Sequence, residues 1–435
     1  METQIIATKL IKPAVPTPDH LRICKLTFLD QLAPMVHVPF MQFYKANHDE
    51  NVQEKLLNSL SQTLIRFYPL AGRFIEDGWY IDCNDMGAEY IEAKINIELH
   101  EFLTLAPQNI HLLDHLLARN DLEAVSYLAT TPILCLKVTT FRCGGIAICT
   151  HLSHKLVDGF TAAAFFREWS GTCKSNTIRQ QVAFPPDYGL DKVFATRNIP
   201  DDINPKHDLS ESPKQKVVTK IFVFGEQAIS TLKSRLANGT DITRPTRVEA
   251  VTSTVLKAIT AATDSRKDYL MFYCAINMRG RTSLMKRASE DNSLLCGNFC
   301  IPVPIKINRN DKNLEVQDVV TLMRTKIGEV AELCSRTLNP DDLYSKLALN
   351  LNEIIGSMGK ENVDTVYFSS LCRFPFYEAD FGWGKPEWVT TGGMTIELAF
   401  FMDPKSGGGI AATVCLEEEK MVRFECDPDI LAFTS

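Results

Sequence analysis

The first half of the chain contains apolar residues at both strand-like and helix-like spacings. Residues 22–29 alternate apolar and polar positions, which predicts a half-buried strand. Residues 51–67 place leucines on one face of a helix, and Tyr68-Pro69 ends it because proline cannot continue a helix. Further strands are predicted over residues 79–83, 89–95, 133–141 and 146–152, with a turn at Gly144-Gly145.

The pattern after residue 152 predicts a strand end followed by a helix. Residues 160–169 favour a helix, and Asp158 stands where its N-cap belongs. From about residue 184 to 216 the chain is polar and rich in proline, which indicates a linker.

The second half again mixes the two element types. A Thr-x-x-Glu capping box, Thr246 to Glu249, heads a long apolar helix that reaches residue 262. Strands are predicted over 217–224, 269–276, 300–307 and 398–402, and helices over 226–236, 316–333 and 347–355. This mixture without repeats favours two α/β layers over a helical bundle or a β-sandwich.

Composition narrows the classes of partner and compartment. The net charge is -7 and no Lys/Arg-rich block occurs, which argues against nucleic acid, although a few basic side chains suffice for a small anion such as a CoA nucleotide. The chain shows no secretory signal and no run of eighteen apolar residues, so a cytoplasmic protein without a membrane span is expected. Its 13 cysteines are scattered without a Cys-x-x-Cys pair, which indicates reduced thiols rather than disulfides or zinc.

A His-x-x-x-Asp pattern, His154 to Asp158, lies at the predicted strand end. An imidazole can remove the proton of an alcohol as its oxygen attacks an acyl carbon, so His154 is a candidate general base. The alternative is a structural histidine at a strand end. Asp158 could orient the imidazole or cap the helix, and a metal site that also uses His151 is disfavoured because alternate strand residues face opposite ways.

The segment Asp380-Phe381-Gly382-Trp383-Gly384 also stands out. Two glycines around a tryptophan indicate a tight backbone path, so a rigid turn is one reading of it. The chain has no complete dinucleotide fingerprint, P-loop or Gly-x-Ser-x-Gly. Nucleotide hydrolysis and serine-hydrolase chemistry therefore lack their usual motifs.

Together the two motifs resemble the paired signatures of the plant BAHD acyltransferases. The resemblance extends over nearly the whole chain, through Leu29-Asp30-Gln31, residues 67–73, Cys83-Asn84-Asp85, Thr246 to Glu249, Asn277-x-Arg279 and Gly297-Asn298. The opening residues 10–18 and the phrase at 372–377 resemble its vinorine synthase-like branch, which includes deacetylvindoline acetyltransferase and in which most members use acetyl-CoA. The resemblance therefore implies acetyl transfer to a hydroxyl of a plant specialised metabolite of alkaloid or terpenoid type.

The resemblance also implies a fold of two chloramphenicol-acetyltransferase-like α/β domains joined by a crossover, with a channel between them. The expected domains are residues 1–184 and 217–435, with a linker at 185–216 and a short segment after about 380 packing with the first domain. A monomer is expected, with acyl-CoA and a small alcohol as substrates and neither a bound cofactor nor a metal.

Site residues follow from the same comparison. His154 is the expected base and Gly159 a supporting residue, while Asp158 is expected to pair with Arg279 in a structural role. The Asp that matches Asp380 is sometimes given a catalytic role in the family, although its segment lies away from the channel in the family's folds, so the resemblance makes Asp380 a catalytic candidate with a structural role as the alternative. The region of Thr252 and Ser253 is the candidate for cofactor binding.

One departure concerns the oxyanion donor. Many members carry a Trp nine residues before the Asp of Asp-Phe-Gly-Trp-Gly, and this chain has Leu371 there. Leucine cannot donate a hydrogen bond, so the donor is expected to be the hydroxyl of Ser369 or Ser370, or a backbone N–H.

Three alternatives remain open from the sequence. Cys149 or another thiol could act as a nucleophile in a ping-pong mechanism. The chain could also bind a ligand without turnover. Within the leading reading, the acyl group could be longer than acetyl, and the acceptor could be an amine, a sugar or a phenol.

Overall fold

The chain folds into two compact units in the computed structural model. It describes residues 1–46, 51–75, 79–119, 130–175, 186–197, 216–238, 241–263, 266–282, 295–309, 314–337, 339–357, 360–394 and 396–435. Unit 1 comprises Met1–Ser210, Ala288–Phe299 and Phe374–Gly392; unit 2 comprises Glu211–Arg287, Cys300–Arg373 and Gly393–Ser435. Strands and helices occur in both, which confirms the predicted α/β class.

Unit 1 is built on a six-stranded sheet with the order β1-β6-β7-β8-β3-β13. Only the pair β6–β7 is parallel among the strand pairs described in this sheet. Its strands are β1 (Thr3–Ile11), β6 (Ala88–Ile95), β7 (Leu134–Phe141), β8 (Ile146–Ser153), β3 (His37–Tyr44) and β13 (Trp388–Thr391). A second, small sheet pairs β2 (Ile23–Lys25), β5 (Tyr80–Asp82) and β4 (Arg73–Phe74).

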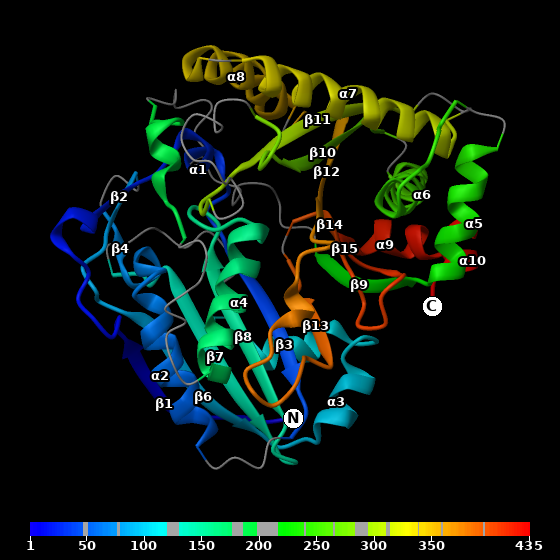
Figure 1. Cartoon of the computed structure of the whole chain (residues 1–435). Coiled ribbons are helices and arrows are strands. Elements are labelled where there is room, and N and C mark those ends of the chain that lie inside the picture. Colours follow the sequence, from blue (N-terminus) through cyan, green and yellow to red (C-terminus); the bar gives the residue numbers. More distant parts are fainter. Residues whose placement is uncertain are drawn as a thin grey trace. The chain divides into compact units, whose positions relative to one another are not determined.

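A long helix covers one face of this sheet. The helix α4 (Gly159–Ser175) lies along β7, β8 and β3 (Figure 1), and Phe166 meets Phe40 of β3 edge to face at 6.3 Å. The described part of unit 1 also contains α1 (Phe28–Leu32), α2 (Val52–Leu64), α3 (Leu99–Leu105) and the 3-10 helices η1 (Asp19–Leu21), η2 (Tyr68–Ala71), η3 (Ile110–Leu116), η4 (Gly189–Lys192) and η7 (Phe376–Glu378). The packing of the apolar side of α4 on the sheet thus sets the position of the N-terminus of this helix.

Unit 2 has its own six-stranded sheet, in the order β11-β10-β12-β14-β15-β9. Its strands are β9 (Val217–Phe224), β10 (Tyr269–Asn277), β11 (Cys300–Asn308), β12 (Val363–Ser370), β14 (Leu398–Met402) and β15 (Ile410–Glu417). The helix α6 (Arg247–Ala262) contacts β15, and it also contacts α5, α7, α9 and α10, whose bounds follow (Figure 1). The other helices in the described part of unit 2 are α5 (Glu226–Ala237), α7 (Val316–Arg336), α8 (Pro340–Ser357), α9 (Glu418–Glu425) and α10 (Pro428–Phe433).

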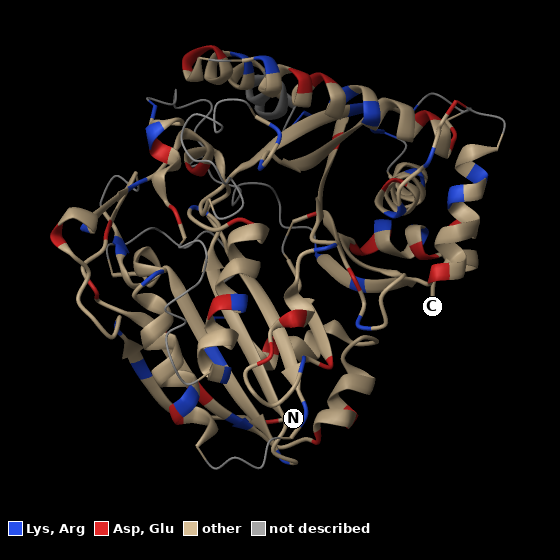
Figure 2. Ribbon diagram, viewed as in Figure 1, with Lys and Arg blue, Asp and Glu red and all other residues tan. Residues whose placement is uncertain are grey.

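The distribution of charge follows burial. The strands β3 and β8 contain no Lys, Arg, Asp or Glu and are uniformly tan in Figure 2, whereas α7 carries both signs along its length. A strand covered on both faces is expected to be continuously apolar, and β8 is buried at every position.

The expected elements agree with the structure where periodicity is long, and differ where a local motif decides. The predicted strand over 22–29 is wrong in its second half, because β2 ends at Lys25 and α1 begins at Phe28. There Thr27 and Asp30 form a reciprocal capping box, which favours a helix start over strand alternation.

The strand β1 has no predicted counterpart, since most of its residues are exposed and lack the alternation of a half-buried strand. Most of the predicted linker, residues 198–215, lies outside the described residues.

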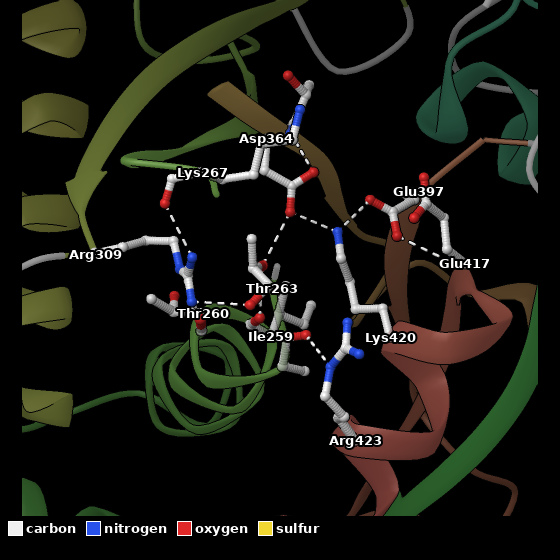
Figure 3. Close-up of polar contacts among 12 residues, drawn as sticks. Ile259, Thr260, Thr263, Lys267, Arg309, Asp364, Glu397, Glu417, Lys420 and Arg423 are labelled. Atoms are coloured by element: carbon white, nitrogen blue, oxygen red, sulfur yellow. Dashed lines mark hydrogen bonds and ion pairs between the residues drawn. The ribbon is translucent and has the colours of Figure 1, made fainter. Parts of the chain in front are cut away.

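Unit 2 contains a buried ion-pair cluster that connects α9 to the sheet. The ammonium of Lys420 lies 2.5 Å from Asp364 and 2.6 Å from Glu397, and its side chain is only 4% exposed (Figure 3). Nearby, Arg309 donates to the carbonyls of Thr260 and Thr263. The guanidinium of Arg309 thus satisfies carbonyls at the C-terminal end of α6 that have no partner within the helix.

Removing Lys420 should cost more stability than removing an exposed lysine. Lys420→Met leaves two buried carboxylates without their counter-charge, so we expect the free energy of unfolding to fall by about 3–5 kcal/mol. The matched control is Lys216→Met, which removes an ion pair with Glu418 whose lysine side chain is 69% exposed; it should cost less than about 1 kcal/mol. Urea denaturation of both variants measures the difference, and equal losses would contradict the assignment.

Candidate active site

His154 follows the last residue of β8 in the middle of the unit 1 sheet. Both neighbours of β8, β7 and β3, pair with it in antiparallel register up to Leu152 and Ser153. The backbone N–H of His154 donates to the carbonyl of Val36 at 2.8 Å, and its side chain is half-buried. The imidazole is therefore carried by a rigid strand end.

Within the described part of the chain, the imidazole of His154 contacts the side-chain amide of Asn298. Nδ1 lies 3.2 Å from Asn298 Oδ1, and Asn298 Nδ2 donates to the carbonyl of His154 at 2.7 Å. Burial lowers the pKa of His154 below its usual value, outweighing Asp158 and the hydrogen bonds, which raise it. The ring is accordingly neutral at pH 7, the state that a general base requires.

The buried carboxyl group of Asp30, in α1, accepts hydrogen bonds from the same residue, Asn298. Asp30 Oδ1 accepts from the backbone N–H and from Nδ2 of Asn298, both at 2.9 Å, and Oδ2 accepts from Thr27. Burial raises the pKa of Asp30 to about 6, although these hydrogen bonds favour the ionised form. Near pH 7.5 a carboxylate therefore lies on the far side of the amide from His154.

Asp158 caps α4. Its Oδ1 accepts from the backbone N–H of Thr161 at 2.9 Å and from that residue's hydroxyl at 2.8 Å, which is N-cap geometry. Its Oδ2 accepts from the backbone N–H of Phe299 at 3.2 Å. The structure thus places Asp158 in the position that the capping alternative requires, directly before Gly159, the first residue of the helix.

The turn between β8 and α4 is also tied to α1. Lys155 is buried and its ammonium donates to the carbonyl of Gln31 at 2.7 Å, while Gln31 in turn exchanges two hydrogen bonds with the backbone of Arg197. The Leu29-Asp30-Gln31 motif therefore supports the His154 turn through both of its polar residues.

Asp380 organises a tight turn at the other end of α4. Its Oδ1 accepts from the backbone N–H groups of Gly382 and Gly384 at 2.8 and 2.9 Å, and its Oδ2 lies 2.5 Å from the ammonium of Lys174. Both glycines have φ near +110°, a conformation that favours glycine. Phe381 meets Trp169 of α4 edge to face at 4.8 Å.

The geometry separates Asp380 from His154. Lys174 lies fifteen residues after Gly159, the first residue of α4, which at 1.5 Å per residue is about 22 Å along the helix. Asp380 contacts the C-terminal end of α4, whereas His154 precedes its N-terminus. The unit 1 structure brings His154 together with Asp158 but not with Asp380, which favours the rigid-turn reading of the second motif.

The remaining candidates lie in unit 2. Arg279 follows β10 and donates its backbone N–H to Asn277, and Ser370 is the exposed last residue of β12. Leu371 is buried and donates its backbone N–H to Phe401. Thr252 and Ser253 are buried in the middle of α6, where the Ser253 hydroxyl donates to the carbonyl of Ala250. The role of each stays a prediction.

The thiol nucleophile alternative finds little support in the surroundings of Cys149. Its side chain is buried, and burial raises its pKa to about 12, so the reactive thiolate is scarcely populated at neutral pH. His151, whose Nδ1 lies 3.8 Å from the sulfur, has its pKa lowered by burial to about 3 and supplies no cation. No three metal-ligating side chains gather among the described residues.

Two residues of the site were not assigned a role from the sequence. Asp30 and Asn298 occur in the motifs Leu29-Asp30-Gln31 and Gly297-Asn298, but 268 positions separate them. A local signal existed for Asp30 only, because Thr27-x-x-Asp30 has capping-box spacing and thereby fixes the carboxylate.

The comparisons with known proteins define the class. A family model described as the Transferase family matches residues 1–431. The chain is 33% identical to epi-neemfruitin B synthase L1AT of Melia azedarach, covering 100% of this chain and 99% of that one. It is 31% identical to acetyl-CoA-benzylalcohol acetyltransferase of Clarkia breweri, covering 100% of both. The crystal structure of vinorine synthase superposes with a TM-score of 0.80 at 26% identity, covering 100% of this chain and 99% of that one.

The chain therefore belongs to the Transferase family of BAHD acyltransferases, and the resemblance seen in its motifs is confirmed. It is an acyltransferase with the two-domain α/β fold of that family. None of the helices in the described part of the chain is long and apolar enough to cross a membrane.

Asp158 should contribute more to stability than an ordinary helix cap. Asp158→Ala removes the cap of α4 and leaves the buried N–H of Phe299 without this acceptor, so we expect a loss of roughly 3 kcal/mol. Asp427→Ala, which removes the N-cap of α10, is the matched control and should cost about 1 kcal/mol. Thermal and urea denaturation compare the two; equal losses would mean that the Phe299 contact contributes nothing.

Substitutions of Asp380 should affect folding rather than chemistry. Asp380→Asn keeps an oxygen for both glycine N–H groups and should cost less than about 1 kcal/mol, because the partner Lys174 is largely exposed. Asp380→Ala loses both hydrogen bonds and should cost about 2 kcal/mol. Denaturation and steady-state kinetics on both variants are the measurement. An Asp380→Asn protein as stable as the wild type but 100-fold slower would assign a chemical role instead.

Proposed function

We propose that this acyltransferase transfers an acetyl group from acetyl-CoA to a hydroxyl of a plant specialised metabolite, with His154 as general base. The observation that carries the proposal is a neutral, half-buried imidazole held at a rigid strand end by a buried polar network. An alcohol is a poor nucleophile until its proton is removed, and a neutral imidazole is suited to that task near pH 7.

The names of the relatives support acetyl as the group and an alcohol as the acceptor. One relative is an acetyl-CoA-benzylalcohol acetyltransferase, and the relatives also include limonoid O-acetyltransferases of Citrus sinensis. The matches extend over the full length of this chain, so the similarity is not confined to one domain. For this chain we propose that the acceptor is an alkaloid alcohol, a terpenoid alcohol or a simpler alcohol.

The transfer needs no enzyme-bound acyl group. The acceptor oxygen attacks the thioester carbonyl carbon while its proton passes to the imidazole, which gives a tetrahedral intermediate. The C–S bond then breaks, and the imidazolium returns the proton to the leaving thiolate, which departs as CoA. Base and substrates account for every atom, so acyl-CoA acts as a co-substrate and no metal or prosthetic group is required.

The negative charge on the intermediate needs a donor. The backbone N–H of Leu371 donates to the Phe401 carbonyl and the leucine side chain has no donor, so we propose the hydroxyl of Ser370 or Ser369 for this role. We further propose a supporting pair of Asp158 and Arg279, binding of acyl-CoA near Thr252 and Ser253, and a monomer in the cytoplasm.

His154→Ala should abolish most of the activity. Loss of the base should lower kcat about 100-fold or more, whereas Cys149→Ala, which removes the alternative nucleophile, should leave turnover within a few-fold of the wild type. The assay uses acetyl-CoA with benzyl alcohol and a panel of alkaloid and terpenoid alcohols, with products detected by the mass gain of one acetyl group. Near-wild-type turnover by His154→Ala would overturn the assignment.

A mass spectrum of the intact protein separates the two mechanisms directly. After incubation with acetyl-CoA alone, direct transfer predicts no covalent adduct, whereas a ping-pong enzyme accumulates an acyl-enzyme. A mass increase of one acetyl group that disappears in Cys149→Ala would replace the proposal by the thiol mechanism.

A further inference from the structure

The helix α4 leaves one narrow stripe of its surface uncovered, and the N-terminal end of that stripe is aromatic. The stripe runs through Phe160, Arg167, Gly171 and Lys174, positions that recur at helical spacing and of which none is buried. Arg167 and Lys174 are exposed and charged, as is usual on the solvent side of a helix. Phe160 instead places a half-buried phenyl ring in the first turn, two residues after Asp158.

A second half-buried ring lies against the first. Phe374 belongs to the same compact unit as Phe160, and the two ring centroids are 6.3 Å apart with their planes at 74°. Two rings nearly at right angles form a corner, which we call the Phe160–Phe374 corner. A third ring placed in such a corner lies flat on one phenyl and points an edge at the other, the two arrangements that aromatic rings prefer.

The back of the corner is a packed aromatic core. Phe374 lies 6.4 Å from Phe376, which stacks on Phe40 of β3 at 5.2 Å and meets Phe166 of α4 edge to face at 6.1 Å. These last three rings are at most 4% exposed. Close-packed interiors yield little, so the corner is a preformed surface that a ligand does not have to order on binding.

The position of the corner relates it to the reaction. It stands at the N-terminal end of α4, the end that follows the turn with His154 and that Asp158 caps. A single exposed apolar side chain is common on proteins and carries no inference. Here two rings on a rigid back adjoin the helix end that the base precedes, which is the setting of a substrate contact.

The size of the corner indicates its occupant. An acetyl group offers one methyl, which is too small to contact two phenyl rings at once. The corner itself is hydrocarbon, so it attracts through burial of apolar surface and offers no hydrogen bond. It therefore fits an apolar ring, aromatic or alicyclic, that belongs to the acceptor.

We propose that the Phe160–Phe374 corner binds an apolar ring of the acceptor alcohol and thereby favours ring-bearing acceptors over open-chain ones. The inference rests on the proposed function, since the bound ring has to present its hydroxyl to His154. Both phenylalanines are specificity-determining residues in this scheme and take no part in proton transfer.

Steady-state kinetics with two alcohols test the preference. Phe160→Ala should lower kcat/KM for benzyl alcohol about 10-fold, mainly through KM, because the variant loses ring contacts and no reacting group. For ethanol, which has no ring, kcat/KM should change less than about two-fold, and the KM for acetyl-CoA should stay the same. Phe374→Ala should show the same pattern. A folded Phe160→Ala protein that keeps the wild-type ratio of benzyl alcohol to ethanol would overturn the proposal.

Two further variants separate recognition from a merely structural role. Phe222→Ala is the matched control, since Phe222 is a half-buried ring that meets Phe424 edge to face at 5.2 Å in unit 2; it should leave the ratio unchanged. Phe160→Tyr retains a ring and should retain the preference for benzyl alcohol. Equal losses with both alcohols in Phe160→Ala would show a structural role and overturn the assignment.

The acyl group is the other possible source of a ring. Benzoyl-CoA, tested as a competitor of acetyl-CoA, should have the same inhibition constant against the wild type and Phe160→Ala, whether or not its acyl group is transferred. Weaker inhibition of the variant, with benzyl alcohol unaffected, would place the acyl group in the corner and overturn the proposal.

Binding measured without turnover distinguishes failure of this proposal from failure of the proposed function. The 19F signal of 4-fluorobenzyl alcohol broadens on binding to protein in the absence of acetyl-CoA. His154→Ala should bind this probe like the wild type, and Phe160→Ala about 10-fold more weakly. If His154→Ala retains turnover, the assignment of the base fails and the corner stands. If Phe160→Ala binds the probe like the wild type, the corner fails whatever the activity of His154→Ala.

Discussion

Two buried carboxylates hold the segment 297–299 against the turn that carries His154, and the site in unit 1 depends on this clamp. Asp30 accepts from both N–H groups of Asn298, and Asp158 accepts from the backbone of Phe299 while capping α4. Three pieces of chain that are distant in sequence are thereby joined by hydrogen bonds to charged acceptors, which are stronger than neutral ones. The imidazole inherits its position from these contacts and not from packing alone.

The two motifs that characterise the family lie at opposite ends of α4. His154 and Asp158 stand at its N-terminus, where the strand end supplies the base and the cap fixes the helix. Asp380 stands at its C-terminus, where it holds two glycines in a tight turn and Phe381 packs on Trp169. The helix links the motifs mechanically over about 22 Å, so a motif can matter for the enzyme without touching the substrate.

Much of the fold was predictable from periodicity. Residues 217–224 form the predicted strand β9, and residues 247–262 form the helix whose capping box was visible in the sequence. The prediction failed at residues 22–29, where a capping box outweighed the alternation, and at β1, an edge strand whose mostly exposed residues carry no hydrophobic period. In both cases the period of apolar residues was not the quantity that decided the structure.

The sequence by itself determined the family, the α/β class and the candidacy of His154, because these depend on residue types at fixed spacings along one chain. Only the tertiary structure decided that Asp30 and Asn298 adjoin His154, since the contact spans 268 residues and no local spacing encodes it. It also added the hydrogen bond between the capping residue Asp158 and the backbone of Phe299, and it placed Asp380 at the far end of α4. Hydrogen bonds across such separations arise from how the sheet and helices pack, which a reading of one sequence does not contain.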